Sequence, residues 1–147
     1  VSEIKVMADM TVPARMESLE RLLKSATDSA LKCGLAGQSL YAAELVTEEA
    51  VLNVFKYAYP NGEGNVRLRC MRDGDGFVIE VTDWGVPFDA TAQPAADITS
   101  PLEERQVGGQ GIHLIKKMTD GMEYTRKDRQ NILSLIIRKK GPSGTER

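Results

Sequence analysis

The spacing of apolar positions predicts one strand and two helices in the first part of the chain. Residues 2–12 alternate loosely between apolar and polar side chains and stop before a proline, which is typical of a strand. In residues 14–34 the apolar side chains recur at helical spacing, which predicts a helix that stops at Gly34. A second helix is predicted from Ser39, as its cap, through residue 59, because a turn-forming Pro-Asn-Gly sequence follows.

The second part of the chain predicts strands in pairs. Residues 65–72 and 77–84 alternate between apolar and polar, and the Asp-Gly-Asp-Gly sequence between them favours a tight turn. A helix over 111–120 precedes two more alternating segments, 122–127 and 132–139. This order of elements predicts an α+β fold, a two-layer sandwich of a mixed, mainly antiparallel sheet covered on one face by helices.

Two stretches lack any periodicity. Residues 85–108 accumulate prolines, alanines and aspartates, and so long a connection within a compact domain is typical of a functional lid. The polar residues 141–147 are expected to form a flexible tail. We expect residues 1–140 to fold as one domain, because a chain of 147 residues can bury one core but not two comfortable ones.

Charge and composition limit which classes of binding partner are expected. Nineteen basic and 21 acidic side chains give a net charge of −2, which lacks the positive excess that attracts nucleic acid. No apolar run approaches the roughly 20 residues that cross a bilayer, and the first residues lack the apolar core of a secretory signal. Cys33 and Cys70 do not have metal-binding spacing and are expected to be reduced thiols. We therefore expect a cytoplasmic protein with no direct contact to nucleic acid or membrane.

Two polar residues interrupt the apolar stripe of the second predicted helix. At about 100° per residue, Glu49 and Asn53 fall inside the stripe formed by Ala42, Leu45, Val46, Ala50, Leu52 and Tyr57. A buried carboxylate without a partner is destabilising or takes up a proton, so the pair calls for a partner. Their i, i+4 spacing would let the amide oxygen ligate a hard cation while the carboxylate reaches an attacking hydroxyl. A hydrogen bond between the two side chains is the structural alternative.

Asp83 is a similar exception in a strand. It shares one face with Phe77, Ile79 and Val81, which are the core-facing positions, so its carboxylate is expected to point inward at the end of the strand. Gly85 would let the backbone turn closely around a ligand. As an isolated Asp-x-Gly sequence, the pattern is only a turn signal.

Three glycines precede the helix predicted at residues 111–120. The sequence Gly-Gly-Gln-Gly over 108–111 would expose backbone N–H groups and direct a helix N-terminus at an anion. His113 follows on this helix, where a structural role is the simpler interpretation. By itself the loop is a weak phosphate-binding signal.

Taken in order, these segments resemble a known family. Glu-Glu-Ala-Val-Leu-Asn (48–53), Val-Thr-Asp-Trp-Gly-Val-Pro-Phe-Asp (81–89) and Gly-Gly-Gln-Gly-Ile-His-Leu-Ile (108–115) resemble the N box and two glycine boxes of GHKL-type ATPases. That superfamily includes histidine kinases, gyrase and Hsp90. Within it, a short chain with an Asp-x-Gly-x-Pro-Phe-Asp box looks most like the RsbW-like anti-sigma factor serine/threonine kinases, and the histidine kinase-like ATPase fold is expected.

The resemblance implies a role for each polar exception in the pattern. Glu49 would be the general base that activates the substrate hydroxyl, and Asn53 would be a ligand of Mg²⁺. Asp83 would accept a hydrogen bond from the adenine amino group of ATP, and Gly85 would shape the pocket of the base. One departure is Tyr57, which stands where these kinases often have a histidine.

The same resemblance assigns the triphosphate of ATP to the glycine loop. Gly109, Gln110 and Gly111 would wrap the phosphates, and residues from about 90 to 108 would form a lid over them. Gln110 stands where an apolar residue is common between the glycines. Neither departure removes a group that the chemistry requires.

The activity implied is that of an ATP- and Mg²⁺-dependent serine/threonine protein kinase. Its substrate would be an anti-anti-sigma (STAS-like) protein, a sigma factor would be the regulated ligand, and the kinase would be a homodimer. A module that binds ATP and sequesters a partner with little turnover is one alternative. A histidine kinase catalytic domain is less favoured, because the sole histidine, His113, lies inside the ATP-binding motif. Simple ATP hydrolysis ranks third, since such relatives couple turnover to further domains.

Overall fold

The computed structural model describes residues 3–89 and 115–139 of the chain. Each strand and both long helices that the periodicity predicts are present. Their bounds are β1 Ile4–Pro13, α1 Leu19–Lys32, α2 Gly37–Tyr57, β2 Asn65–Asp73, β3 Gly76–Asp83, β4 Gly121–Lys127 and β5 Gln130–Arg138. A 3-10 turn, Met16–Ser18, precedes α1, and residues 115–118 are helical.

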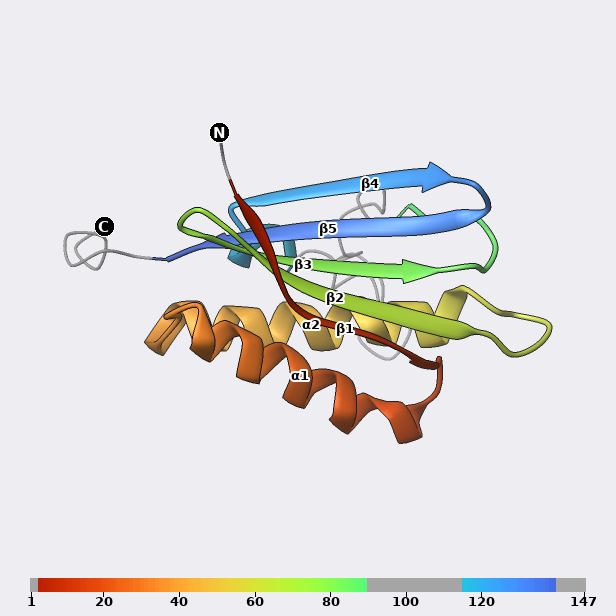
Figure 1. Cartoon of the computed structure of the whole chain (residues 1–147). Coiled ribbons are helices and arrows are strands. Elements are labelled where there is room, and N and C mark those ends of the chain that lie inside the picture. The colour runs from red at the N-terminus through yellow and green to blue at the C-terminus, as the bar shows by residue number, and fades with distance from the viewer. Residues whose placement is uncertain (1–2, 90–114, 140–147) are drawn as a thin grey trace, which may run out of the picture.

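The strands form one sheet in the order β1-β2-β3-β5-β4, and all of these pairings are antiparallel. Figure 1 shows α1 and α2 together on one face of this sheet. The predicted α+β sandwich is therefore confirmed, and within the described ranges its sheet is antiparallel throughout rather than mixed. Neither helix there combines the length and apolarity that a membrane span requires.

The helix ends differ in part from those predicted. Gly34 does end α1: it has a φ of +90°, and Leu35 N donates to Ala30 O at 3.0 Å, the bonding of a glycine-terminated helix. Ser39, however, is not the cap of α2, which begins at Gly37. Its hydroxyl reaches back from the third helical position, accepting from Ala36 N at 3.1 Å and donating to Ala36 O at 2.9 Å.

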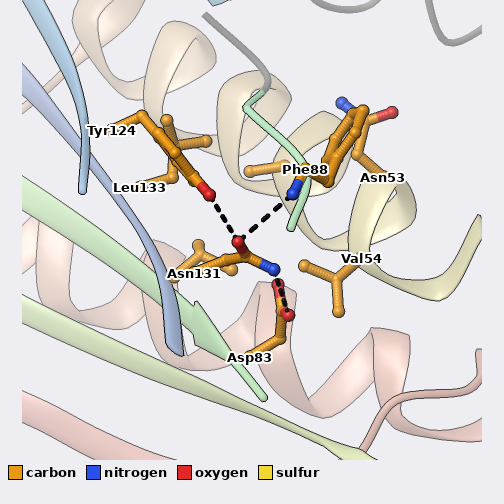
Figure 2. A pocket seen from close by; sticks show the side chains of 9 residues that line it. Asn53, Val54, Asp83, Phe88, Tyr124, Asn131 and Leu133 are labelled. Atoms are coloured by element: carbon orange, nitrogen blue, oxygen red, sulfur yellow. Dashed lines mark hydrogen bonds between the residues drawn. The ribbon is translucent and has the colours of Figure 1, made fainter. Parts of the chain in front are cut away.

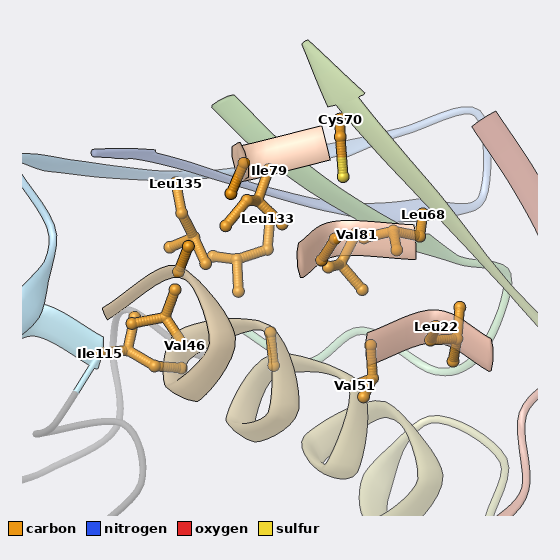
Figure 3. Packing of buried hydrophobic residues seen from close by; sticks show 14 of the residues in the cluster. Leu22, Val46, Val51, Leu68, Cys70, Ile79, Val81, Ile115, Leu133 and Leu135 are labelled. Carbon is orange, nitrogen blue, oxygen red and sulfur yellow. The ribbon is translucent and has the colours of Figure 1, made fainter. Parts of the chain in front are cut away.

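The core lies between the helices and the sheet. Alternate strand residues face the helices and are buried, namely Val66, Leu68, Cys70, Phe77, Ile79, Val81, Leu133, Leu135 and Ile137. They pack against Leu22 and Ala26 of α1 and Val46 and Val51 of α2 (Figure 3). Burying each large apolar side chain contributes about 1.5–3 kcal/mol. This core can therefore tolerate a few buried polar groups at one edge.

Candidate functional site

A pocket lies at that edge, between α2 and the ends of the central strands. One wall is formed by three residues of α2, namely Ala50, Asn53 and Val54. The opposite wall is formed by residues of β3, β4, β5 and the segment after β3, namely Val81, Asp83, Phe88, Tyr124, Asn131 and Leu133 (Figure 2). The structure thus brings Asn53 and Asp83 together, although 30 positions separate them in the sequence. Both side chains are buried, at 4% and 5% exposure.

Among the described residues, the side-chain nitrogen of Asn53 has no hydrogen-bond partner. Nδ2 is buried and unpaired in the described part of the chain. Leaving such a group unsatisfied is destabilising by about 1–3 kcal/mol. None of the hydrogen bonds between described residues joins Asn53 to Glu49, so the structural alternative of a Glu49–Asn53 pair is not supported. The pocket instead offers a polar side chain to a ligand.

Glu49 lies one turn before Asn53 and is only partly buried. The buried face of α2 includes four of the predicted positions, Ala42, Val46, Ala50 and Asn53, and four others, Ala43, Thr47, Val51 and Val54. Three residues predicted to be on the stripe, Leu45, Leu52 and Tyr57, are partly exposed. Glu49 therefore lies at the border of the apolar stripe rather than inside it. Partial burial, and secondly the charge of Glu48, raise the pKa of the Glu49 carboxyl.

Asp83 is the last residue of β3, and one of its two carboxylate oxygens accepts two hydrogen bonds. Oδ1 accepts hydrogen bonds from Gly85 N at 2.9 Å and from Asn131 Nδ2 at 2.8 Å. No hydrogen bond from the described residues reaches Oδ2. Burial raises the pKa of Asp83, against the lowering effect of these two bonds and of the charge on Arg126. The prediction that Asp83 points to the core side of the sheet is confirmed.

Asn131 is a pocket residue that the sequence interpretation missed. Its Oδ1 accepts from Tyr124 OH at 2.5 Å, from Arg126 Nη1 at 3.2 Å and from Phe88 N at 3.3 Å. Nδ2 donates to Val86 O at 2.8 Å in addition to Asp83. The signal that reveals Asp83 also applies here, because Asn131 shares the core face of β5 with three buried apolar residues, Leu133, Leu135 and Ile137.

Aromatic rings close the pocket beside Asn53. The rings of Tyr57 and Phe88 stack with centroids 4.8 Å apart, which joins the last turn of α2 to the segment after β3. Phe88 also lines the pocket and gives it an apolar wall. The tyrosine at position 57 thus has a packing role.

Gly85 is required by packing against α2. A Cβ at this position would lie 2.0 Å from Ala58 O, and the adjacent Val86 N donates to that same oxygen at 2.9 Å. We expect Gly85→Ala to lower the free energy of unfolding by about 1–3 kcal/mol, because backbone must move to admit the methyl group. Chemical denaturation checks this. Gly62→Ala is the matched control, since its Cβ meets nothing within 4 Å, and an equal effect of both changes would contradict the explanation.

Several predicted features lie outside the described residues. They are the phosphate-loop candidates Gly109, Gln110 and Gly111, the lid at 90–108, His113 and the tail at 141–147. Their roles therefore stay predictions. Within residues 3–89 and 115–139, no group of three or more His, Cys, Asp or Glu side chains gathers to hold a metal.

Comparison with known proteins identifies relatives of this chain. It is 29% identical over 119 residues to the serine-protein kinase RsbW of Halalkalibacterium halodurans, covering 78% of this chain and 73% of that protein. It is 24% identical over 96 residues to the serine/threonine-protein kinase BtrW of Bordetella bronchiseptica, covering 65% and 68%. The histidine kinase AdeS of Acinetobacter baumannii has a similar fold, with a TM-score of 0.50 and 14% identity over 90% of this chain and 68% of that one.

The family profile of the histidine kinase-like ATPase domain matches residues 12–137, which is most of the chain. This range holds both long helices, β2, β3, β4, all but the last residue of β5, and every residue of the pocket. The resemblance seen in the three sequence boxes is therefore confirmed. The chain belongs to the family of histidine kinase-like ATPase domains.

Proposed function

We propose that this protein is an ATP- and Mg²⁺-dependent serine/threonine protein kinase of the anti-sigma factor type. The observation that carries this proposal is the pair of buried polar side chains, Asn53 and Asp83, on opposite walls of one pocket, with Glu49 one turn from Asn53. Similarity to RsbW and BtrW, which are named as serine and serine/threonine kinases, supports the choice of reaction.

The Asp83 end of the pocket offers the groups that would recognise an adenine base. Val54, Val81 and Leu133 supply apolar surface, as a planar base requires. Asp83 Oδ2 is an acceptor without a partner among the described residues, and an exocyclic amino group would donate to it. This bond would stabilise the ionised carboxylate, against the burial that raises its pKa.

The Asn53 end fits a hydrated divalent cation. A half-turn of the amide exchanges its nitrogen and oxygen, so the oxygen can take the position in which Nδ2 now lacks a partner. Mg²⁺ prefers oxygen ligands and retains several waters, so one protein ligand suffices beside the phosphates. When bound, the ion neutralises charge on the phosphoryl oxygens. By family analogy, Gly109, Gln110 and Gly111 bind the same phosphates.

Glu49 has the properties of a general base for phosphoryl transfer. Its carboxylate takes the proton of a serine or threonine hydroxyl while that oxygen forms a bond to the γ-phosphorus of ATP. The bond from this phosphorus to the β,γ-bridging oxygen breaks, and ADP leaves. The raised pKa makes the ionised Glu49 carboxylate a stronger base than that of an exposed glutamate.

The proposed partners follow from the family alone. The substrate is an anti-anti-sigma protein of the STAS type, a sigma factor is the regulated ligand, and the kinase acts as a homodimer in the cytoplasm.

Mixing the protein with MgATP and a STAS-like protein from the same genome tests the function. We expect one serine or threonine of the partner to gain a phosphoryl group by mass spectrometry, with one ADP formed per group transferred. ATP binding and partner binding without transfer would identify a sequestering module instead. ADP formation that does not depend on the partner would identify an ATPase.

A further inference from the structure

The side chain of Asn131 makes five hydrogen bonds, and its polarity can fit in one orientation only. Its NH₂ group faces two acceptors, Asp83 Oδ1 and Val86 O, and its oxygen faces three donors from Tyr124, Arg126 and Phe88. Figure 2 shows the bonds to Asp83, Tyr124 and Phe88. Rotating the amide by a half-turn would set oxygen against oxygen and N–H against N–H. At 4% exposure, water cannot easily replace these partners.

This arrangement fixes the carboxylate of Asp83. Asn131 Nδ2 and Gly85 N both donate to Oδ1, so the plane of the carboxylate is set and Oδ2 is left to the pocket. Donation from Asn131 also favours the ionised form of Asp83 and so opposes the burial that raises its pKa. An ionised, immobile carboxylate can only accept hydrogen bonds. A mobile or protonated carboxyl group could donate one as well.

We propose that Asn131 is the positioning residue that makes the pocket select 6-amino purines over 6-oxo purines. This inference rests on the proposed nucleotide site. The amino group of adenine donates to Oδ2, whereas the oxo group of hypoxanthine or guanine places a second acceptor there. That mismatch is costly only while Asp83 can neither rotate nor take up a proton. Sites with buried polar groups discriminate strongly for this reason.

Asn131→Asp tests this role, with ATP and inosine triphosphate as probes, since they differ only by amino against oxo at the purine 6-position and the hydrogen at N1. The new carboxylate keeps the three donors on its far side and places a negative charge against Asp83 Oδ1, which favours protonation of Asp83. With that proton on Oδ2, Asp83 can donate to an oxo group. We expect the ratio of the Kd for inosine triphosphate to the Kd for ATP, measured by calorimetry at neutral pH, to fall by about tenfold or more.

Three further variants separate positioning from simple loss of structure. Asn131→Ser removes both Nδ2 donors without adding charge, and the same fall in the ratio is expected if the aspartate variant does not fold. Tyr124→Phe removes one bond from the opposite side of Asn131, so both affinities should decrease together at an unchanged ratio. Ser134→Ala, on the other face of β5, should leave both affinities as in the wild type.

The outcomes distinguish this inference from the proposed function. Wild-type protein that binds neither nucleotide would overturn the proposed function, and the inference with it. Wild-type protein that binds ATP, combined with an unchanged ratio in both Asn131 variants, would overturn the inference alone. Equal affinity of the wild type for the two nucleotides would do the same.

Discussion

We expect Glu49→Gln to reduce the rate of the proposed phosphoryl transfer to the partner by about 100- to 10,000-fold, the usual contribution of a positioned general base. Glutamine keeps the size and hydrogen-bonding capacity of glutamate but cannot accept the proton of the hydroxyl. Glu49 is partly buried at the border of the apolar stripe of α2, and Asn53, one turn away, is unchanged in the variant. We therefore expect the affinity for MgATP to stay within about threefold of the wild type, measured by calorimetry.

Glu48→Gln is the matched control, because it changes the neighbouring carboxylate on the same helix. Glu48 raises the pKa of Glu49, so removing its charge lowers that pKa. Glu49 must be ionised to accept a proton, and the transfer rate consequently falls as the pH drops through its pKa. We expect the acid limb of the pH–rate profile to move to lower pH in Glu48→Gln. Wild-type transfer rates in Glu49→Gln would rule out its role as the base.

We expect Asp83→Asn to weaken ATP binding at the proposed site by roughly 10- to 100-fold. A hydrogen bond to a charged group is worth about 1.5–3 kcal/mol, and the substitution removes it. In the variant, the amide oxygen keeps the bonds from Gly85 N and Asn131 Nδ2, so the NH₂ group takes the place of Oδ2. It then faces the amino group of adenine as a second donor. Calorimetry against Asp73→Asn, at the opposite end of the β2–β3 hairpin, measures the effect.

The same variant does not lose stability. Burial raises the pKa of Asp83 in the folded state, so the folded protein binds the proton more tightly than the unfolded chain does. Stability then falls as the pH rises from the unfolded to the folded pKa, and the ionised form is penalised above both. A neutral asparagine avoids this penalty. We expect Asp83→Asn to melt at or above the wild-type temperature at neutral pH, and a clear decrease would show that the carboxylate is structural.

Periodicity in the sequence was sufficient for the elements of the fold and for part of the site. Alternation along β3 identified Asp83, because a charged residue on the core face stands out against three apolar ones. Asn131 is likewise a polar residue on the core face of a strand, but its role depends on its contact with Asp83. That contact exists because β5 pairs with β3 in the sheet, and the two strands are far apart in the sequence. Helical periodicity located Asn53 correctly but overestimated the burial of Glu49, because a rotation of α2 by part of a turn moves a residue across the border of the stripe.

Predictions from residue type were least reliable at positions where contacts with backbone atoms determine the role of the residue. Ser39 has the residue type of a cap, yet its hydroxyl caps from inside the helix, and sequence cannot distinguish these two positions. Gly85 was expected to let the backbone turn closely around a ligand, and that role stays a prediction, but the sequence did not reveal that Ala58 O excludes a side chain there. Such a contact depends on how closely two elements approach, and residue types alone do not specify this distance.

Val86 N donates a hydrogen bond to Ala58 O, and Arg126 donates one to Gly85 O. These two bonds have a consequence for the thermodynamics of binding. They connect the pocket wall that contains Asp83 to the end of α2 and to β4 without any contribution from a nucleotide. A base that enters this end therefore meets a rigid template, and its association should show little loss of protein entropy.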